Sequence, residues 1–193
     1  LDDKVAFVLG GMGLIGREIS NAFAEAGAKV IILDLQRSKD DCYERKQLDS
    51  GYKVYFSDFD CMDLDSIDRN LYDIHANFGC PDVFLNCSYP RNSDWTKNSF
   101  RDITLNSFRE NIDFHLNSYS WLARKIAEKM VEKNKQGSII QLGSIYGVVG
   151  QDLDIYEGTD MKENMTYSLI KGGIVNFSRQ MASYYGKHNI RVN

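Results

Sequence analysis

The stretch KVAFVLGGMGLIGREISNAFAEAGAKVIILDLQ, residues 4–36, decides the fold that we predict for this chain. It begins with an apolar run at residues 5–9, passes through a glycine-rich turn at residues 10–16 and reaches a second apolar run at residues 29–33. Between the two runs, residues 14–26 carry apolar side chains at helical spacing. Strand, turn, helix and strand in this order predict a βαβ unit of a parallel sheet.

The turn between the two runs holds four glycines in seven residues. Glycines allow a tight turn and a close approach of the backbone to a ligand, and the following helix offers free N–H groups to an anion such as a pyrophosphate. A glycine-rich turn of this kind can also be an ordinary connection between a strand and a helix, without a bound ligand. The predicted cofactor contacts in the turn are Gly10, Gly11, Gly13, Leu14, Ile15 and Gly16.

The end of the second strand indicates which dinucleotide the turn holds. Asp34 lies 18 residues after Gly16, where a carboxylate accepts hydrogen bonds from the adenosine ribose hydroxyls and repels a 2′-phosphate. Arg37 is close enough in sequence to pair with such a phosphate, although the simpler interpretation is a solvated loop residue. Asp34 therefore predicts NAD as the cofactor, with NADP less favoured.

A second group of residues points to catalysis. Tyr167 and Lys171 are four residues apart, so on a helix they share one face. A neighbouring ammonium favours the phenolate, so the tyrosine could exchange a proton near neutral pH. Ser144 follows the apolar run that starts at residue 138, at the sheet edge where ligands of such folds bind. The Tyr-x-x-x-Lys pattern is common by chance, and its combination with the serine is more specific than either part.

Short apolar runs alternate with helical segments along the whole chain. The predicted strands are residues 5–9, 29–33, 53–56, 83–85 and 138–142, with a last one beginning at Ile190. The predicted helices are residues 14–26, 38–49, 64–78, 108–132 and 167–185. Residues 148–165 show neither the periodicity of a strand nor that of a helix. A loop that long is usually a lid, a binding loop or a disordered stretch. With 193 residues, 43% of them hydrophobic, the chain is predicted to form one α/β domain with a doubly wound parallel sheet, residues 1–193.

The charge, the length of the apolar runs and the cysteine spacing argue against several classes of partner. The net charge is −4 and the basic residues are scattered, which argues against nucleic-acid binding. The apolar runs are too short to cross a bilayer, so no membrane association is expected. The four cysteines, Cys42, Cys61, Cys80 and Cys87, have neither C-x-x-C nor zinc-type spacing. We therefore expect no metal site and, because no signal sequence precedes the first strand, a reduced cytoplasmic protein.

Taken together, the glycine turn, Asp34, Ser144 and the Tyr167/Lys171 pair resemble the short-chain dehydrogenase/reductase family, and the resemblance covers essentially the whole chain. It implies a Rossmann-like domain and hydride transfer between a nicotinamide and a carbonyl or alcohol. It also implies Tyr167 as the general acid/base and Ser144 as a hydrogen-bonding partner of the substrate oxygen. Lys171 is then expected to hold the nicotinamide ribose and to lower the pKa of Tyr167.

Two further stretches carry the resemblance. In SDFD, at residues 57–60, Asp58 lies where the family contacts adenine, and NCSY at residues 86–89 begins with Asn86 and replaces the family's Asn-Asn-Ala-Gly. Both residues are therefore predicted cofactor contacts. The resemblance also implies a homodimer or homotetramer that packs through the helices at residues 108–132 and 167–185.

One departure affects the proposed proton relay. His115 stands where compact members of the family carry an asparagine that is associated with a relaying water. An imidazole could relay protons at neutral pH, which makes His115 a candidate catalytic residue. Two alternatives stay open: His115 could be a partly buried helix residue hydrogen-bonded to a neighbour, and Asn111, one turn earlier, could serve instead.

Other departures concern the substrate. Leu14 replaces the middle glycine of compact members, and 23 residues separate Ser144 from Tyr167; both features resemble the extended branch, which acts on nucleotide-activated sugars. Residues 167–193 resemble the compact branch, which is our primary assignment. The alternatives are a nucleotide-sugar epimerase or dehydratase with tightly bound NAD, and a dinucleotide-binding protein without catalysis.

A narrower similarity is to a bacterial subgroup associated with flagellin or surface-polysaccharide sugar modification, carried by His115, by residues 154–161 and by residues 173–193. It implies a polar small-molecule substrate, which could be sugar-derived. Family members continue beyond the last predicted strand into segments that contact nicotinamide and substrate, so we expect that the C-terminal part of the fold is missing from this chain or disordered.

Overall fold

The protein is described here by a computed structural model that covers residues 1–35, 47 and 50–193. Six parallel strands form one sheet in the order β3-β2-β1-β4-β5-β6. Their bounds are β1 Val5–Leu9, β2 Lys29–Asp34, β3 Val54–Asp58, β4 Val83–Asn86, β5 Gly137–Gln141 and β6 Ile190–Val192. The predicted doubly wound parallel sheet is therefore confirmed. The predicted helix at residues 38–49 and Arg37 lie outside the described residues, apart from position 47 of that helix.

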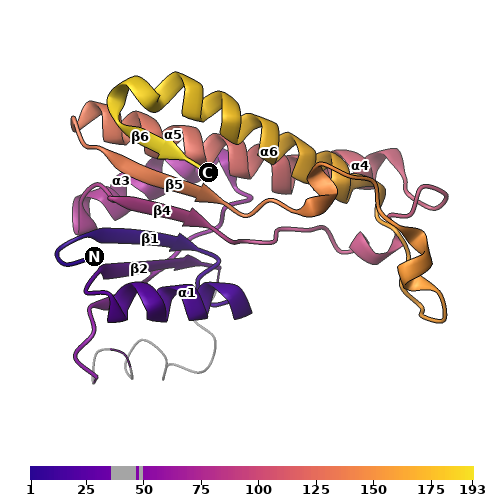
Figure 1. Cartoon of the computed structure of the whole chain (residues 1–193), viewed down its shortest axis with the longest axis horizontal. Helices are drawn as coiled ribbons and strands as arrows, with labels where there is room; N and C mark the ends of the chain where they lie inside the picture. The colour runs from indigo at the N-terminus through magenta and orange to yellow at the C-terminus, as the bar shows by residue number, and fades with distance from the viewer. Residues whose placement is uncertain (36–46, 48–49) are drawn as a thin grey trace.

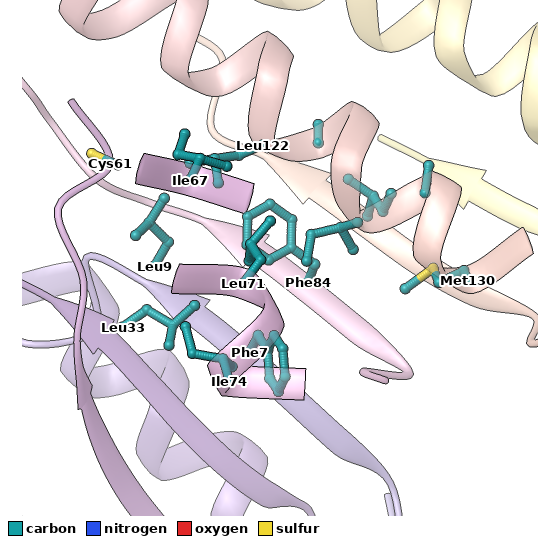
Figure 2. Close-up of a cluster of buried hydrophobic side chains, with 14 of the residues drawn as sticks. Phe7, Leu9, Leu33, Cys61, Ile67, Leu71, Ile74, Phe84, Leu122 and Met130 are labelled. Carbon is teal, nitrogen blue, oxygen red and sulfur yellow. The ribbon is translucent and has the colours of Figure 1, made fainter. Parts of the chain in front are cut away.

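Helices cover both faces of this sheet (Figure 1). Their bounds are α1 Leu14–Glu25, α3 Ile67–Phe78, α4 Leu105–Asn111, α5 Ser118–Glu132 and α6 Met165–Tyr185. On one face, Phe7 and Leu9 of β1 pack with side chains of α3 and α5, and Figure 2 shows this cluster. On the other face, Ala6 and Val8 pack toward Ala24 of α1. Alternate residues of one strand thus pack into two different hydrophobic cores. This explains why the strands appear in the sequence as continuous apolar runs.

The strand register brings functional positions to one edge of the sheet. Leu9 at the end of β1 pairs with Leu33 of β2 and with Asn86 of β4. Between β1 and β4 the strand order reverses, because the chain builds β1, β2 and β3 outward in one direction and then returns to the other side. Such a switch point leaves a crevice at the carboxyl ends of the strands, where ligands of open α/β sheets bind.

Several element boundaries differ from the sequence prediction. Strand β3 extends to Asp58, two residues beyond the predicted end, because its polar last residues still pair with Leu33 and Asp34. Strand β5 runs one residue earlier than predicted. Helix α6 begins at Met165, before Tyr167, because the side chain of Asn164 accepts hydrogen bonds from two backbone N–H groups of its first turn. Residues 148–165 contain one short 3₁₀ turn, at Leu153–Tyr156.

The predicted helix at residues 108–132 is not continuous α-helix. Helix α4 passes into a π-helical segment, Ile112–Asn117, before α5 begins. The hydroxyl of Ser118 donates to the backbone oxygens of Phe114 or His115, 2.6 and 3.1 Å away, at the point where the π segment ends. Short π segments inside α-helices frequently occur at functional sites, and this one carries His115.

No helix in the part of the chain that the structure describes is both long and apolar enough to span a bilayer. Within the same residues, no group of three His, Cys, Asp or Glu side chains is arranged to hold a metal ion.

Candidate active site

A cleft of about 950 Å³ opens at the carboxyl edge of the sheet, beside the ends of β1 and β4. Its walls come from the glycine turn after β1, from residues 87–91 after β4 and from residues 142 and 143 after β5. Asp34, Tyr167 and Lys171 also line it. Residues that are up to 162 positions apart in the sequence, from Leu9 to Lys171, therefore meet in one cavity.

The glycine turn is too tightly packed for side chains at two of its positions. Gly10 has a φ of +75°, and a Cβ atom there would lie 2.7 Å from the backbone nitrogen of Ser88. A Cβ atom at Gly16 would overlap the carbonyl oxygen of Gly10. Two backbone hydrogen bonds close the turn further: the N–H of Gly10 donates to the carbonyl oxygen of Leu33, and the N–H of Gly13 donates to that of Gly10. Glycine is required at both positions because backbone atoms fill the space of a Cβ atom, those of Ser88 at Gly10 and those of the turn itself at Gly16.

The N-terminus of α1 opens toward the cleft and suits an anion. Gly13 is the N-cap and offers no side-chain oxygen, and the first turn contains no acidic residue. The first N–H groups of a helix have no partner within the helix, and their partial positive charge attracts phosphate. Leu14 keeps 92% of its surface exposed, so leucine is tolerated at this position without filling the turn. These residues fit a dinucleotide pyrophosphate.

The carboxylate of Asp34 is fixed beside this turn. Its Oδ2 atom accepts a hydrogen bond from the backbone N–H of Met12 at 2.9 Å, and its Oδ1 atom accepts one from Leu35 at 2.8 Å. Each carboxylate oxygen has further acceptor capacity. Asp34 can therefore hold the turn in place and still accept a hydrogen bond from a ligand in the cleft.

Tyr167 and Lys171 project from the first turns of α6 into the same cleft. The ammonium of Lys171 lies 5.9 Å from the centre of the Tyr167 ring and donates a hydrogen bond to the backbone oxygen of Leu142 at 2.7 Å. Only 3% of Lys171 is exposed, and this burial lowers its pKa to about 8. At neutral pH the residue is therefore a buried cation beside a phenol.

Ser144 follows β5 next to the cleft, although the cleft wall itself is formed by Leu142 and Gly143. The hydroxyl oxygen of Ser144 accepts a hydrogen bond from Tyr146 at 3.2 Å. The 3₁₀ turn that follows, Ile145–Gly147, packs so closely on α6 that a Cβ atom at Gly147 would lie 2.7 Å from the carbonyl oxygen of Lys171. This contact ties the segment after Ser144 to the helix that carries Tyr167 and Lys171.

The arrangement agrees with a family assignment. The family profile described as short chain dehydrogenase matches residues 4–193. The chain belongs to the short-chain dehydrogenase family. The resemblance predicted from the motifs is therefore confirmed, together with the Rossmann-like fold.

Individual relatives of this short-chain dehydrogenase extend the assignment. It is 28% identical over 195 residues to post-translational flagellin modification protein A from Campylobacter coli, covering 100% of this chain and 75% of that protein. It is 29% identical over 192 residues to cis-4-hydroxycyclohexanecarboxylate dehydrogenase from Sinomonas cyclohexanicum, covering 99% and 71%. The predicted similarity to a subgroup linked to flagellin modification is thus confirmed.

A solved structure shares the fold as well. The short chain dehydrogenase of Leptospira borgpetersenii serovar Hardjo-bovis, solved with bound NAD⁺, superposes with a TM-score of 0.84 at 27% sequence identity. The match covers 100% of this chain and 70% of that chain.

His115 of this short-chain dehydrogenase lies deeper than the partly buried helix residue that the sequence offered as an alternative. It is fully buried, and neither ring nitrogen has a hydrogen-bond partner among the described residues, so the partly buried, hydrogen-bonded histidine is not observed. Its ring packs against Tyr119 and edge-on against Tyr89, with centroids 5.1 and 5.3 Å apart. Burial, and secondarily the charge of Lys171, lowers the pKa of His115 to about 3. The imidazole is therefore neutral at physiological pH.

The remaining predicted residues lie around the cleft and do not line it. Asn86 is fully buried, and its side-chain oxygen accepts hydrogen bonds from Ser88. Asp58 is exposed at the end of β3, next to Phe59, which does line the cleft. Gly11 packs against Ile32, with a hypothetical Cβ atom 2.8 Å from its side chain. Asn111, the alternative relay residue, is buried and hydrogen-bonded to Ser107 and to the backbone of Asn92.

Sequence reasoning missed an aromatic group around Tyr167. The ring centres of Tyr89, Tyr146 and Trp95 lie 6.2, 6.4 and 6.5 Å from that of Tyr167. Tyr89 and Trp95 follow β4, whereas Tyr146 follows β5 and Tyr167 lies on α6, so no single spacing could predict the cluster. A usable signal was the position of Tyr89, three residues after β4 ends at Asn86, on the carboxyl edge of the sheet.

Proposed function

We propose that this chain is an NAD-dependent oxidoreductase that interconverts a secondary alcohol and a carbonyl of a polar small molecule, with Tyr167 as the general acid/base. The observation that carries the proposal is that Tyr167 and Lys171 share one cleft with the glycine turn and Asp34. A cofactor site and a proton-transferring group within one cavity are what hydride transfer from an alcohol carbon, or to a carbonyl carbon, requires. The polar substrate could be a sugar derivative, in keeping with the flagellin-modification relative.

The catalytic residues then have separate roles. The nicotinamide supplies hydride chemistry when it is bound, accepting a hydride from the alcohol carbon or returning it. Tyr167 takes the hydroxyl proton during oxidation and gives it back during reduction. Lys171 is charged below about pH 8 because burial lowers its pKa to about 8, and its ammonium lies 5.9 Å from the centre of the Tyr167 ring. Ser144 donates a hydrogen bond to the substrate oxygen and keeps it aligned with Tyr167.

The cofactor contacts follow from the fit of the residues to a dinucleotide. Residues 10–16 would hold the pyrophosphate at the N-terminus of α1, and Asp34 would accept the adenosine ribose hydroxyls. Asp58 would contact adenine, and Asn86 would lie beside the nicotinamide half. Because a carboxylate repels a 2′-phosphate, NAD is favoured over NADP, in agreement with the NAD⁺ bound in the Leptospira relative.

Asp34→Ala tests the choice of cofactor. We expect NADH binding to weaken by about tenfold, because a hydrogen bond to a charged group contributes roughly 1.5–3 kcal/mol, and we expect discrimination against NADPH to relax. Fluorescence titrations with NADH and NADPH measure both effects. Asp58→Ala is the contrast, since adenine is common to both cofactors and the NADH to NADPH ratio should stay unchanged. Tighter binding of NADPH than NADH by the unmodified chain would refute the assignment.

His115 is proposed to relay protons between Lys171 and solvent as a neutral imidazole. His115→Asn should keep kcat within about threefold, because an amide also accepts and donates hydrogen bonds, whereas His115→Leu should lower kcat by about tenfold or more. Leucine removes two buried nitrogens that lack protein partners, so the melting temperature should not fall. Steady-state rates and thermal melts of both variants check this. A fully active leucine variant would show that the residue has no relay role.

The wider setting of the enzyme is also a proposal. We take residues 1–193 as one dinucleotide-binding domain that acts in the cytoplasm and assembles as a homodimer or homotetramer through α5 and α6. Trp121 on α5 and Tyr184 on α6 are large side chains that remain 41% and 58% exposed, which suits a contact surface. Light scattering coupled to size-exclusion chromatography measures the oligomeric state.

The function itself is tested by a substrate screen. The full-length protein is mixed with NAD⁺ and with sugars, sugar phosphates, nucleotide sugars and simple secondary alcohols, and NADH formation is followed by absorbance. Net NADH formation with one class supports the proposal. If NADH binds and no class is oxidised, the chain is a dinucleotide-binding protein without this activity.

A further inference from the structure

The substrate side of the cleft has an aromatic wall. Tyr89 lines the cleft and remains 44% exposed, and its ring packs edge-on against Trp95 with centroids 5.5 Å apart. Both rings lie next to Tyr167, the proposed acid/base. An exposed tyrosine in a concave site offers a flat apolar surface that is costly to leave in water. Such a surface favours a ligand with a flat or cyclic skeleton.

Arg91 adds a positive charge to the same wall. Its guanidinium lies 5.8 Å from the centre of the Tyr89 ring, and the side chain is exposed and lines the cleft. Within the described lining, the other charged groups are already engaged: Asp34 binds backbone N–H groups, and Lys171 is buried and donates to Leu142. Arg91 is the charged lining residue that is classed as exposed, and it forms no ion pair with the described residues. Guanidinium groups bind carboxylates and phosphates in bidentate geometry.

A buried polar network holds this wall in place. The side chain of Asn92, the residue after Arg91, donates to Ser107 at 2.8 Å, and its backbone N–H donates to Asn111. Three residues further on, the backbone oxygen of Trp95 accepts a hydrogen bond from Asn164, which also caps α6. These hydrogen bonds thus fix the segment that carries Tyr89 and Arg91 to the helix that carries Tyr167.

We propose that the substrate is a cyclic alcohol or ketone that carries a carboxylate or phosphate, with its ring on Tyr89 and its anionic group on Arg91. The inference rests on the oxidoreductase function proposed above and names the class of its substrate. The aromatic wall places the ring next to Tyr167, and Arg91 sets which end of the substrate faces out of the cleft. Arg91 and Tyr89 are therefore specificity-determining residues.

Calorimetry with the full-length protein saturated with NADH tests the proposal, because alcohols are not oxidised in that complex. The probes form two matched pairs: cyclohexanol with cis-4-hydroxycyclohexanecarboxylate, and glucose with glucose 6-phosphate. In at least one pair the anionic probe should bind about tenfold more tightly than its neutral partner, as expected for a charge-assisted contact. The pair that shows the preference identifies the anionic group as carboxylate or phosphate.

Variants assign the preference to its residues. Arg91→Ala should abolish the difference within the pair and Arg91→Lys should retain part of it, because lysine keeps the charge and loses the bidentate geometry. Lys97→Ala is the matched control, since Lys97 is an exposed cation of the same segment outside the cleft lining. Tyr89→Ala should weaken the neutral and the anionic probe alike.

Three results would overturn the proposal: equal binding within both pairs, an anion preference that survives Arg91→Ala, or no binding of any probe. A loss of NADH affinity in Arg91→Ala, with unchanged probe preference, would assign Arg91 to the cofactor phosphates instead. Failure of the unmodified chain to bind NADH would contradict the proposed function itself. If NADH binds and the anion preference is missing, only the substrate class is wrong.

Discussion

Replacing Tyr167 with phenylalanine is expected to lower kcat by about a thousandfold, within the range of about 10²–10⁴ that a positioned acid/base contributes. Only the hydroxyl is removed, so the ring keeps its packing against Tyr89 and Trp95. Proton transfer would then have to go to water. NADH should bind with nearly the same affinity, because the change leaves the glycine turn and Asp34 untouched. Steady-state kinetics and NADH titration of the same preparation measure the two quantities.

Tyr146→Phe is the matched control for this experiment. Tyr146 is another half-buried tyrosine, and its ring centre lies 6.4 Å from that of Tyr167. The substitution removes the same atom, the phenolic oxygen. The kcat of the Tyr146→Phe variant should stay within about threefold of that of the unmodified protein, because a hydroxyl outside the proton path contributes little to the activation free energy. If both variants lost activity equally, the effect would come from the aromatic cluster as a whole. Unchanged turnover in the Tyr167 variant would exclude the acid/base role.

The local parts of the site could be predicted from the sequence because their geometry is short-range. The helical period alone places Tyr167 and Lys171 on one face, and the strand period places Asp34 at a strand end. Parallel pairing then brings that end next to the turn at Gly10. These predictions need only an element and its direction, and the structure puts all of these residues in one cleft.

Long-range and cooperative features could not be predicted in the same way. The π segment at Ile112–Asn117 depends on hydrogen bonds that no residue pattern encodes, and it determines the burial of His115. The polar end of β3 pairs because β2 is beside it, although its own side chains argue against a strand. The aromatic group of Tyr89, Trp95 and Tyr146 surrounds Tyr167 only after the sheet and α6 have brought the segments that follow β4 and β5 together.

Replacing Gly16 with alanine is the second change from which we expect a large effect. The added Cβ atom would overlap the carbonyl oxygen of Gly10, a backbone atom that cannot rotate away, so the turn must open. Overpacking of this kind costs roughly 1–3 kcal/mol. If that strain is relieved by moving the N-terminus of α1 away from the pyrophosphate, NADH binding should weaken by about tenfold to 100-fold, since about 1.4 kcal/mol corresponds to tenfold.

Gly13→Ala provides the comparison within the same turn. There the added Cβ atom would lie 3.3 Å from the same carbonyl oxygen of Gly10, and the φ of −71° suits any residue. A shift of a few tenths of an ångström relieves this contact, so NADH affinity should change by less than about threefold, or less than about 0.7 kcal/mol. Circular dichroism and thermal melts of both variants separate a lost binding site from a lost fold. If the two variants bind NADH equally well, the close packing of the turn around Gly16 does not determine cofactor binding.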